Sequence, residues 1–235
     1  MTAIPRVVSL VPSATETLIE WGVPPIAVTQ YCEQPDYPTV GGTKNPELDA
    51  IVALAPDLVV MCTTENLGEH AQQLESEGLR IHAIDLHTLA DNGPEMARLA
   101  EAVLRPEAGG GPWPSGEPAV ETVRAFIPIW RRPWMTISGP TYGSTLLASI
   151  GVGNVFADHA DWWPEVGLDE VAERSPEMIL APSEPYEFTP VHLDELAEIA
   201  PVYEVDGRDL FWWGVRAPAA VERLRGQLTS GAGDR

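Results

Sequence analysis

Thiol, polar and aromatic side chains follow several of the predicted strands, and these residue types suit ligand binding better than catalysis. Cys32 follows the apolar run at 26–31, and Cys62 follows the apolar run at 58–61. Because parallel strands end at a common edge, where α/β proteins often hold ligands, both thiols are placed to reach a ligand there. A pair of buried, unreactive thiols and a disulfide are the alternative interpretations.

Further residues share this position after a strand, and we expect them to line a ligand cleft. From the first half of the chain come Ser13, Tyr31, Cys32, Lys44, Cys62, Glu65 and Asn66. From the second half come Tyr142, Trp163, Glu184, Tyr186, Phe211, Trp212, Trp213 and Arg216. Clustered aromatic rings suit stacking against a large flat ligand, whose carboxylates would pair with Lys44 and Arg216. Capping of the core by Trp212 and Trp213 is the alternative.

Signals for catalysis are weak. The sequence has no nucleophile elbow, phosphate-binding loop or zinc-protease motif. Glu65 and Glu184 could donate protons, but no partnered nucleophile accompanies them, and the five histidines are scattered singly. We therefore expect a binding protein with no catalytic residue and no cofactor of its own. A cytosolic enzyme or metallochaperone that handles a metal through Cys32, Cys62 and nearby acids is the alternative, and a sensor with an acidic interaction surface is another.

These residues must be positioned by an α/β framework, because short apolar runs alternate with helical patterns. Strands are predicted at 6–12, 26–31, 57–62, 79–86, 177–188 and 201–207. Helices are predicted at 13–22, 46–54, 65–78, 91–105, 118–130, 192–199 and 217–228. Ser13 and Glu16 fit a capping box at the start of the first helix. This alternation predicts mostly parallel sheets.

Two blocks of sequence recur in the same order, which indicates a duplicated α/β unit. Leu48, Asp49, Pro56 and Val59 match Leu168, Asp169, Pro176 and Ile179 at a constant offset. At a second offset, Val8, Ser9, Leu18, Gly22 and Val23 match Ile137, Ser138, Leu147, Gly151 and Val152. We therefore expect two Rossmann-like lobes with the ligand cleft between them.

Composition excludes several classes of function. The chain has 235 residues and a formal net charge of −21, so it lacks the basic surface that nucleic-acid binding requires. No run of about 18 apolar residues is present, so we expect no membrane span. The first residues show no charged region, apolar core or cleavage site of an export signal. We expect a monomer.

Four segments together resemble the substrate-binding proteins of cobalamin and iron-siderophore ABC importers, the helical-backbone (class III) family of periplasmic binding proteins. They read SLVPSATETLIEWGV, YCEQP followed by VGGTKNP, LDAIVALAPDLVV, and WWPEVGLDEVAERSPEMIL. The resemblance runs from about Arg6 to Leu228. It implies an N-terminal lobe at 1–108, a linker with a single connecting helix at 109–130, and a C-terminal lobe at 131–235.

The resemblance also implies a ligand and a partner. The ligand would be cobalamin, haem or a ferric chelate, and Tyr31, Trp163 and Phe211 fall on positions that press on the ring. Asp49 and Asp169 would dock on basic residues of an ABC permease, although an acid near a helix N-terminus is stabilising in any case. Cys62 stands where cobalamin-binding members have tryptophan. The family role implies an extracytoplasmic location, and the absent signal leaves the cytoplasm as the alternative.

Overall fold

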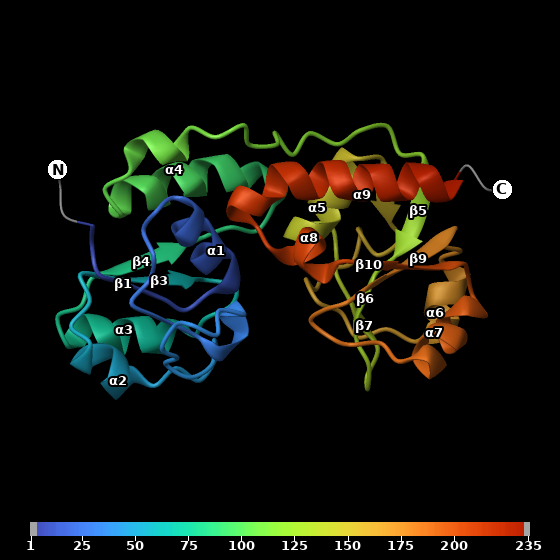
Figure 1. Cartoon of the computed structure of the whole chain (residues 1–235). Coiled ribbons are helices and arrows are strands. Elements are labelled where there is room, and N and C mark those ends of the chain that lie inside the picture. The colour runs from blue at the N-terminus through green and yellow to red at the C-terminus, as the bar shows by residue number, and fades with distance from the viewer. Residues whose placement is uncertain (1–3, 233–235) are drawn as a thin grey trace. The chain divides into compact units, whose positions relative to one another are not determined.

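The computed structural model describes residues 4–232, and these form two compact α/β units (Figure 1). Unit 1 comprises the described residues up to Leu86, together with Asp91–Trp113 and Trp213–Ala217. Unit 2 comprises His87–Ala90, Pro114–Trp212 and the described residues from Pro218 onward. The two-unit α/β architecture predicted from the sequence is confirmed. The short segment His87–Ala90 thus belongs to unit 2 although the residues on either side of it belong to unit 1. Conversely, Trp213–Ala217 belongs to unit 1 although its flanking residues belong to unit 2.

Unit 1 is built on a four-stranded parallel sheet. Its strands are β1 (Val7–Ser9), β2 (Ala27–Val28), β3 (Leu58–Cys62) and β4 (Ile81–Ile84), in the order β2-β1-β3-β4. All three pairings are parallel, with Val7 opposite Leu58 and Val59 opposite Ile81. Every residue of β3 is buried, as expected for a central strand covered on both faces.

Helices cover both faces of this sheet. Unit 1 contains α1 (Pro12–Glu20), η1 (Gln30–Cys32), α2 (Leu48–Ala53), α3 (Gly68–Ser76), α4 (Asn92–Ala102), η3 (Pro106–Gly109) and η4 (Gly214–Arg216). Figure 1 shows α2 and α3 below the strands and α4 above them. The core on the lower face joins Ile51 of α2 and Leu74 of α3 to Val8 and Val59 of the sheet.

The predicted capping box at the start of α1 is wrong. The helix begins at Pro12 with Val11 as its N-cap, and no side chain caps it. Proline suits the first helical position because its φ angle is fixed near the helical value and its missing N–H would have no helical partner there. Ser13 therefore lies inside the first turn, where it is buried.

Unit 2 repeats this plan with one insertion. Strands β5 (Val123–Phe126), β8 (Val152–Asn154), β9 (Met178–Pro182) and β10 (Val202–Val205) form a parallel sheet in the order β10-β9-β5-β8. The hairpin of β6 (Pro128–Trp130) and β7 (Met135–Thr136) is the insertion. The helices are α5 (Tyr142–Ser149), α6 (Leu168–Glu173), α7 (Pro190–Ala197), α8 (Gly207–Phe211) and α9 (Ala217–Ala232).

The connecting helix predicted at 118–130 is absent. Residues 110–122 have neither helical nor strand structure, and the following residues form β5 and β6. The apolar run from Ala125 to Ile127 is fully buried, and its first two residues belong to β5, one of the two internal strands of the unit 2 sheet. Short apolar runs fit a buried strand as well as a helix, and pairing within the sheet decides between them.

The duplication is confirmed, but one part of its alignment is wrong. Val7 of β1 pairs with Leu58, and Ala125 of β5 pairs with Met178, so β5 is the counterpart of β1. Ile137 and Ser138, which the sequence pattern matched to Val8 and Ser9, instead follow the inserted hairpin. The hairpin lengthens the connection between the first strand and the first helix of the repeat, so a single ungapped offset cannot align both.

Candidate functional site

Cys32 follows β2, and two threonine hydroxyl groups contact its sulfur. Its Sγ receives a hydrogen bond from Thr15 Oγ1 at 3.2 Å and lies 3.2 Å from Thr29 Oγ1. The thiol is 1% exposed, and burial raises its pKa, while the hydrogen bonds of Thr15 and Thr29 lower it less. A buried, protonated thiol is a poor nucleophile and a poor metal ligand. The two threonines, which the sequence did not single out, hold the side chain in place.

Cys62 and Asn66 tie the end of β3 to the neighbouring loops. Asn66 Oδ1 accepts the Cys62 N–H at 2.8 Å, and Asn66 Nδ2 donates to the Thr43 carbonyl at 2.8 Å. Cys62 Sγ lies 3.1 Å from Thr64 Oγ1. Burial, followed by the negative charge of Glu65, raises the pKa of the Cys62 thiol to about 11. These contacts place Asn66 in a positioning role for the loop that carries Lys44.

Two predicted ligand residues of unit 1 face solvent. Tyr31 is 57% exposed, and its ring lies over Gly42, where an added Cβ would come within 3.2 Å of Tyr31 Cε2. Gly41 beside it has φ +83°, and its carbonyl accepts the Gln30 N–H, so the two loops are held together. Lys44 is exposed and forms no ion pair with another described residue. Tyr31 and Lys44 are therefore accessible to a ligand.

Two groups of neighbouring aromatic rings in unit 2 contain predicted ligand residues. Trp163 is 45% exposed, and its ring lies 5.7 Å from that of Trp162, which in turn meets His87 edge-on at 4.6 Å. This loop is fixed to β7, because the Thr136 N–H donates to the Pro164 carbonyl and the Ser138 N–H donates to the Trp162 carbonyl. An exposed ring on a fixed backbone is suited to stacking against a flat ligand.

The second group surrounds Tyr186, which is half-buried. Its ring lies 5.1 Å from Trp130 and 5.0 Å from Phe188. Glu184 precedes it in the loop after β9, and Ser183 Oγ accepts the Gly207 N–H at 3.0 Å. The sequence pattern does not indicate Trp130 or Phe188 as site residues. Trp130 lies far along the chain from Tyr186, and Phe188 lies among loop residues without periodicity.

The remaining predicted aromatic residues differ in exposure. Tyr142 is buried, its hydroxyl has no hydrogen-bond partner among the described residues, and burial followed by the charge of Asp209 raises its pKa. Phe211 and Trp212 are half-buried in unit 2, with the Phe211 ring against Gly143. Trp213 belongs to unit 1 and is 3% exposed, so its indole is part of a core.

Arg216 is held by an acid within unit 1. Its Nε donates to Glu16 Oε2 at 2.9 Å, and its Nη2 donates to Glu16 Oε1 at 2.5 Å, which makes a bidentate pair.

Asp49 and Asp169 are exposed in the first turns of α2 and α6, respectively, where a negative charge interacts favourably with the helix dipole.

The part of the chain that the structure describes has neither a metal-binding cluster nor a membrane-spanning helix. No group of three or more His, Cys, Asp or Glu side chains is arranged there to hold a metal ion. None of the helices there has the length and apolar character needed to span a membrane.

The chain folds into two α/β units, each built on a parallel sheet with candidate ligand residues in the loops that follow its strands. No model of a protein family matches the sequence. A vitamin B12-binding protein of Salmonella typhimurium is 28% identical over 199 residues, covering 76% of this chain and 72% of that protein. Other vitamin B12-binding proteins show a similar likeness, among them one of Pectobacterium carotovorum that is 27% identical over 244 residues, covering 96% of this chain and 88% of that protein.

Solved structures agree on the fold. The periplasmic vitamin B12-binding protein BtuF of Vibrio cholerae superposes with a TM-score of 0.77 at 20% identity, covering 96% of this chain and 97% of BtuF. The periplasmic heme-binding protein BhuT, in complex with two hemes, gives a TM-score of 0.79 at 18% identity, covering 96% of this chain and 98% of BhuT. Structural similarity at these sequence identities shows that the chains share a fold.

Proposed function

We propose that this protein is the substrate-binding component of an ABC import system for a cobalamin, a haem or a ferric chelate. The ligands named for similar proteins support this substrate class. The observation that carries the proposal is the exposure of Tyr31 in unit 1 and Trp163 in unit 2, each on a loop that hydrogen bonds hold in place. Exposed rings on ordered loops bind flat ligands with little loss of conformational entropy.

Lys44 is the cation that we assign to the ligand's carboxylates. It is exposed and without an ion pair among the described residues, whereas Arg216 is occupied by Glu16. Tyr186, Phe211 and Trp212 are half-buried and would add apolar contact area. We propose no catalytic role for any residue.

The alternative of a metal-handling enzyme or metallochaperone is less well supported. Both thiols are buried and have raised pKa values, so thiolates are scarce at neutral pH. Among the described residues, no third ligand joins either thiol in a metal-binding group. Neither thiol therefore has the electrostatic environment of a metal-transfer site.

The proposed role implies a partner and a location. We propose that Asp49 and Asp169 dock on an ABC permease and that the protein acts outside the cytoplasm as a monomer. Their exposure supports this, as do the periplasmic proteins of the same fold. Fractionation of producing cells, and co-purification with a permease that is lost on reversing both charges, would test it.

Ligand binding is tested by calorimetry with cyanocobalamin, haemin and a ferric siderophore. We expect saturable binding of one of them, weakened about tenfold by Tyr31→Ala or Trp163→Ala, since one aromatic contact contributes about 0.5–1.5 kcal/mol beyond its buried area. Trp113→Phe is the control, because Trp113 packs on Gly93 and Gly111 in unit 1 and donates to the Gly109 carbonyl. Absence of saturable binding below about 1 mM would remove the proposal.

A further inference from the structure

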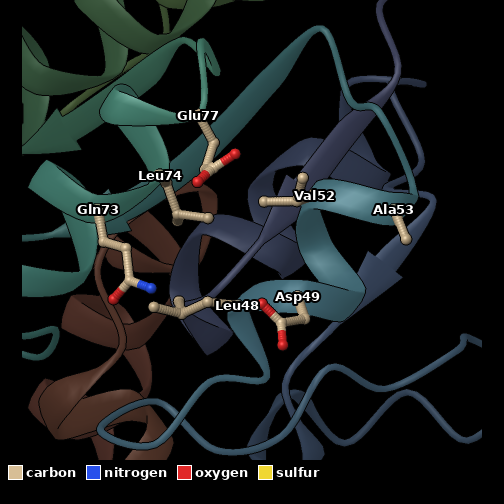
Figure 2. A pocket seen from close by; sticks show the side chains of 7 residues that line it. All are labelled: Leu48, Asp49, Val52, Ala53, Gln73, Leu74 and Glu77. Atoms are coloured by element: carbon tan, nitrogen blue, oxygen red, sulfur yellow. The ribbon is translucent and has the colours of Figure 1, made fainter.

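Helices α2 and α3 of unit 1 enclose a pocket of about 240 Å³ (Figure 2). Its lining consists of Leu48, Asp49, Val52, Ala53, Gln73, Leu74 and Glu77. In Figure 2, Glu77 lies at one end and Asp49 at the other, with apolar side chains between them. The pocket thus has an apolar floor and an acid at each end.

Both acids of the pocket lack a neutralising partner in the described part of the chain. Asp49 and Glu77 are both exposed, and neither carboxylate forms an ion pair with another described residue. Two like charges that share a pocket repel each other and favour a cationic occupant. The net charge of −21 adds to this preference for a basic partner.

The size of the pocket limits the kind of occupant. Pockets for complete small-molecule ligands are typically about 300–1,000 Å³, so this one is too small for a corrinoid or a haem. It suits a single long side chain whose aliphatic part covers Leu48, Val52 and Leu74 while its cationic end meets carboxylates. Arginine fits best, because its planar, weakly hydrated guanidinium pairs with carboxylates in a bidentate manner and also packs on apolar surface.

The duplicated unit carries the same pair of acids. Asp49 lies in the first turn of α2, and Glu77 is the C-cap of α3. At the corresponding places in unit 2, Asp169 lies in the first turn of α6, and Glu198 is the C-cap of α7. Both unit 2 acids are exposed as well. The repeat therefore retains two acids at this position, and only the first of each pair is explained by the permease docking proposed above.

We propose that the α2–α3 pocket receives one arginine side chain of a protein partner and that Glu77 is a second recognition residue beside Asp49. This inference deepens the proposed function, because it rests on the proposal that a basic partner docks at Asp49. It assigns to Glu77, Val52 and Leu74 a part in that docking.

The probe for this pocket is N-acetyl-arginine amide, followed by chemical shifts of the ¹⁵N-labelled protein. We expect weak, saturable shifts that are confined to the backbone amides of α2 and α3. The uncharged isostere N-acetyl-citrulline amide is expected to bind at least about threefold more weakly, which is the effect of losing one exposed ion pair. Equal shifts with citrulline would overturn the inference.

Variants identify the acids involved. Glu77→Gln is expected to weaken binding of the probe about threefold, and the Asp49→Asn, Glu77→Gln double variant to abolish it. The matched control is Glu75→Gln, since Glu75 is also exposed on α3 but does not line the pocket. Equal binding to Glu77→Gln and wild-type protein would refute the role of Glu77.

Calorimetry with the three metal chelates on the same variants separates this inference from the proposed function. Saturable arginine binding by a protein that binds no chelate would support the pocket and overturn the proposed function. Chelate binding without arginine binding would overturn the inference alone.

Discussion

Asn92 and Gly214 are joined by side-chain to backbone hydrogen bonds, although 122 residues separate them in the chain. Asn92 Oδ1 accepts the Gly214 N–H at 2.6 Å, and Asn92 Nδ2 lies 3.5 Å from the Gly214 carbonyl oxygen. Asn92 is fully buried at the start of α4. The pair attaches the segment Trp213–Ala217 to unit 1, where Thr17 Oγ1 also accepts the Val215 N–H.

Gly214→Ala is expected to destabilise the protein. Gly214 has φ +86°, which costs a non-glycine residue about 1–2 kcal/mol, and an added Cβ would lie 2.2 Å from Thr17 Oγ1. We expect the free energy of unfolding in urea to fall by at least that amount. Gly226→Ala is the control, because its Cβ would meet no atom within 4 Å and alanine favours the helix. A Gly214→Ala variant as stable as wild type would contradict the described geometry.

The pair between Arg216 and Glu16 is expected to show measurable coupling. Their side chains are 18% and 29% exposed, so solvent screens the pair only in part. A double-mutant cycle with Arg216→Gln and Glu16→Gln is expected to give about 1 kcal/mol. The more exposed pair of Arg225 and Glu222 is the control and is expected to give less than about 0.5 kcal/mol. Equal coupling in the two pairs would argue against the partial burial of Arg216.

Stability is expected to fall at alkaline pH because of Cys62. Its pKa rises from 9.0 to about 11 on folding, so both states are protonated below about pH 9 and the native state keeps its full stability there. Between about pH 9 and pH 11 the unfolded thiol ionises while the native thiol does not, which lowers the free energy of unfolding by about 1 kcal/mol at pH 10.

Urea unfolding at pH 8 and pH 10 under reducing conditions checks this dependence. In Cys62→Ser, the loss of stability between the two pH values should be about 1 kcal/mol smaller than in wild type. The same loss in both proteins would show that Cys62 does not titrate as described.

Tyr142→Phe is expected to leave stability unchanged or to raise it slightly. The Tyr142 hydroxyl is buried without a hydrogen-bond partner among the described residues, so its removal relieves a desolvation cost. Thr136→Val is the contrasting variant, because the Thr136 hydroxyl donates to the Ile127 carbonyl at 2.7 Å and its loss should cost about 1 kcal/mol. Thermal unfolding compares the two. A stable Tyr142→Phe protein with weakened chelate binding would assign the hydroxyl to the ligand.

The sequence predicts the parallel sheets well because buried parallel strands are short and continuously apolar. Residues 58–62 and 178–182 fulfil this condition, and each is followed by a turn and a helical pattern. The helix predicted at 118–130 is wrong because the apolar residues of this segment suit a helix and a strand alike. Only the partner strands β8 and β9, more than twenty residues further along the chain, decide for the strand.

The candidate site was less predictable, because its contacts join residues that are distant in the chain. Position after a strand indicated Tyr31 and Trp163, which are exposed. The same criterion could not show that Arg216 pairs with an acid 200 residues away, or that Thr15 and Thr29 enclose Cys32. Composition and spacing give the chemical types present, whereas burial and partners come from tertiary packing.

The segment Trp213–Ala217 also bears on how the protein is made. Unit 1 contains most of the first 113 residues, yet its buried Asn92 and Thr17 bond to a segment that is synthesised near the end of the chain. A nascent chain that stops before residue 213 leaves the Asn92 amide without this partner. Unit 1 therefore completes its native contacts only after residues 213–217 have been synthesised.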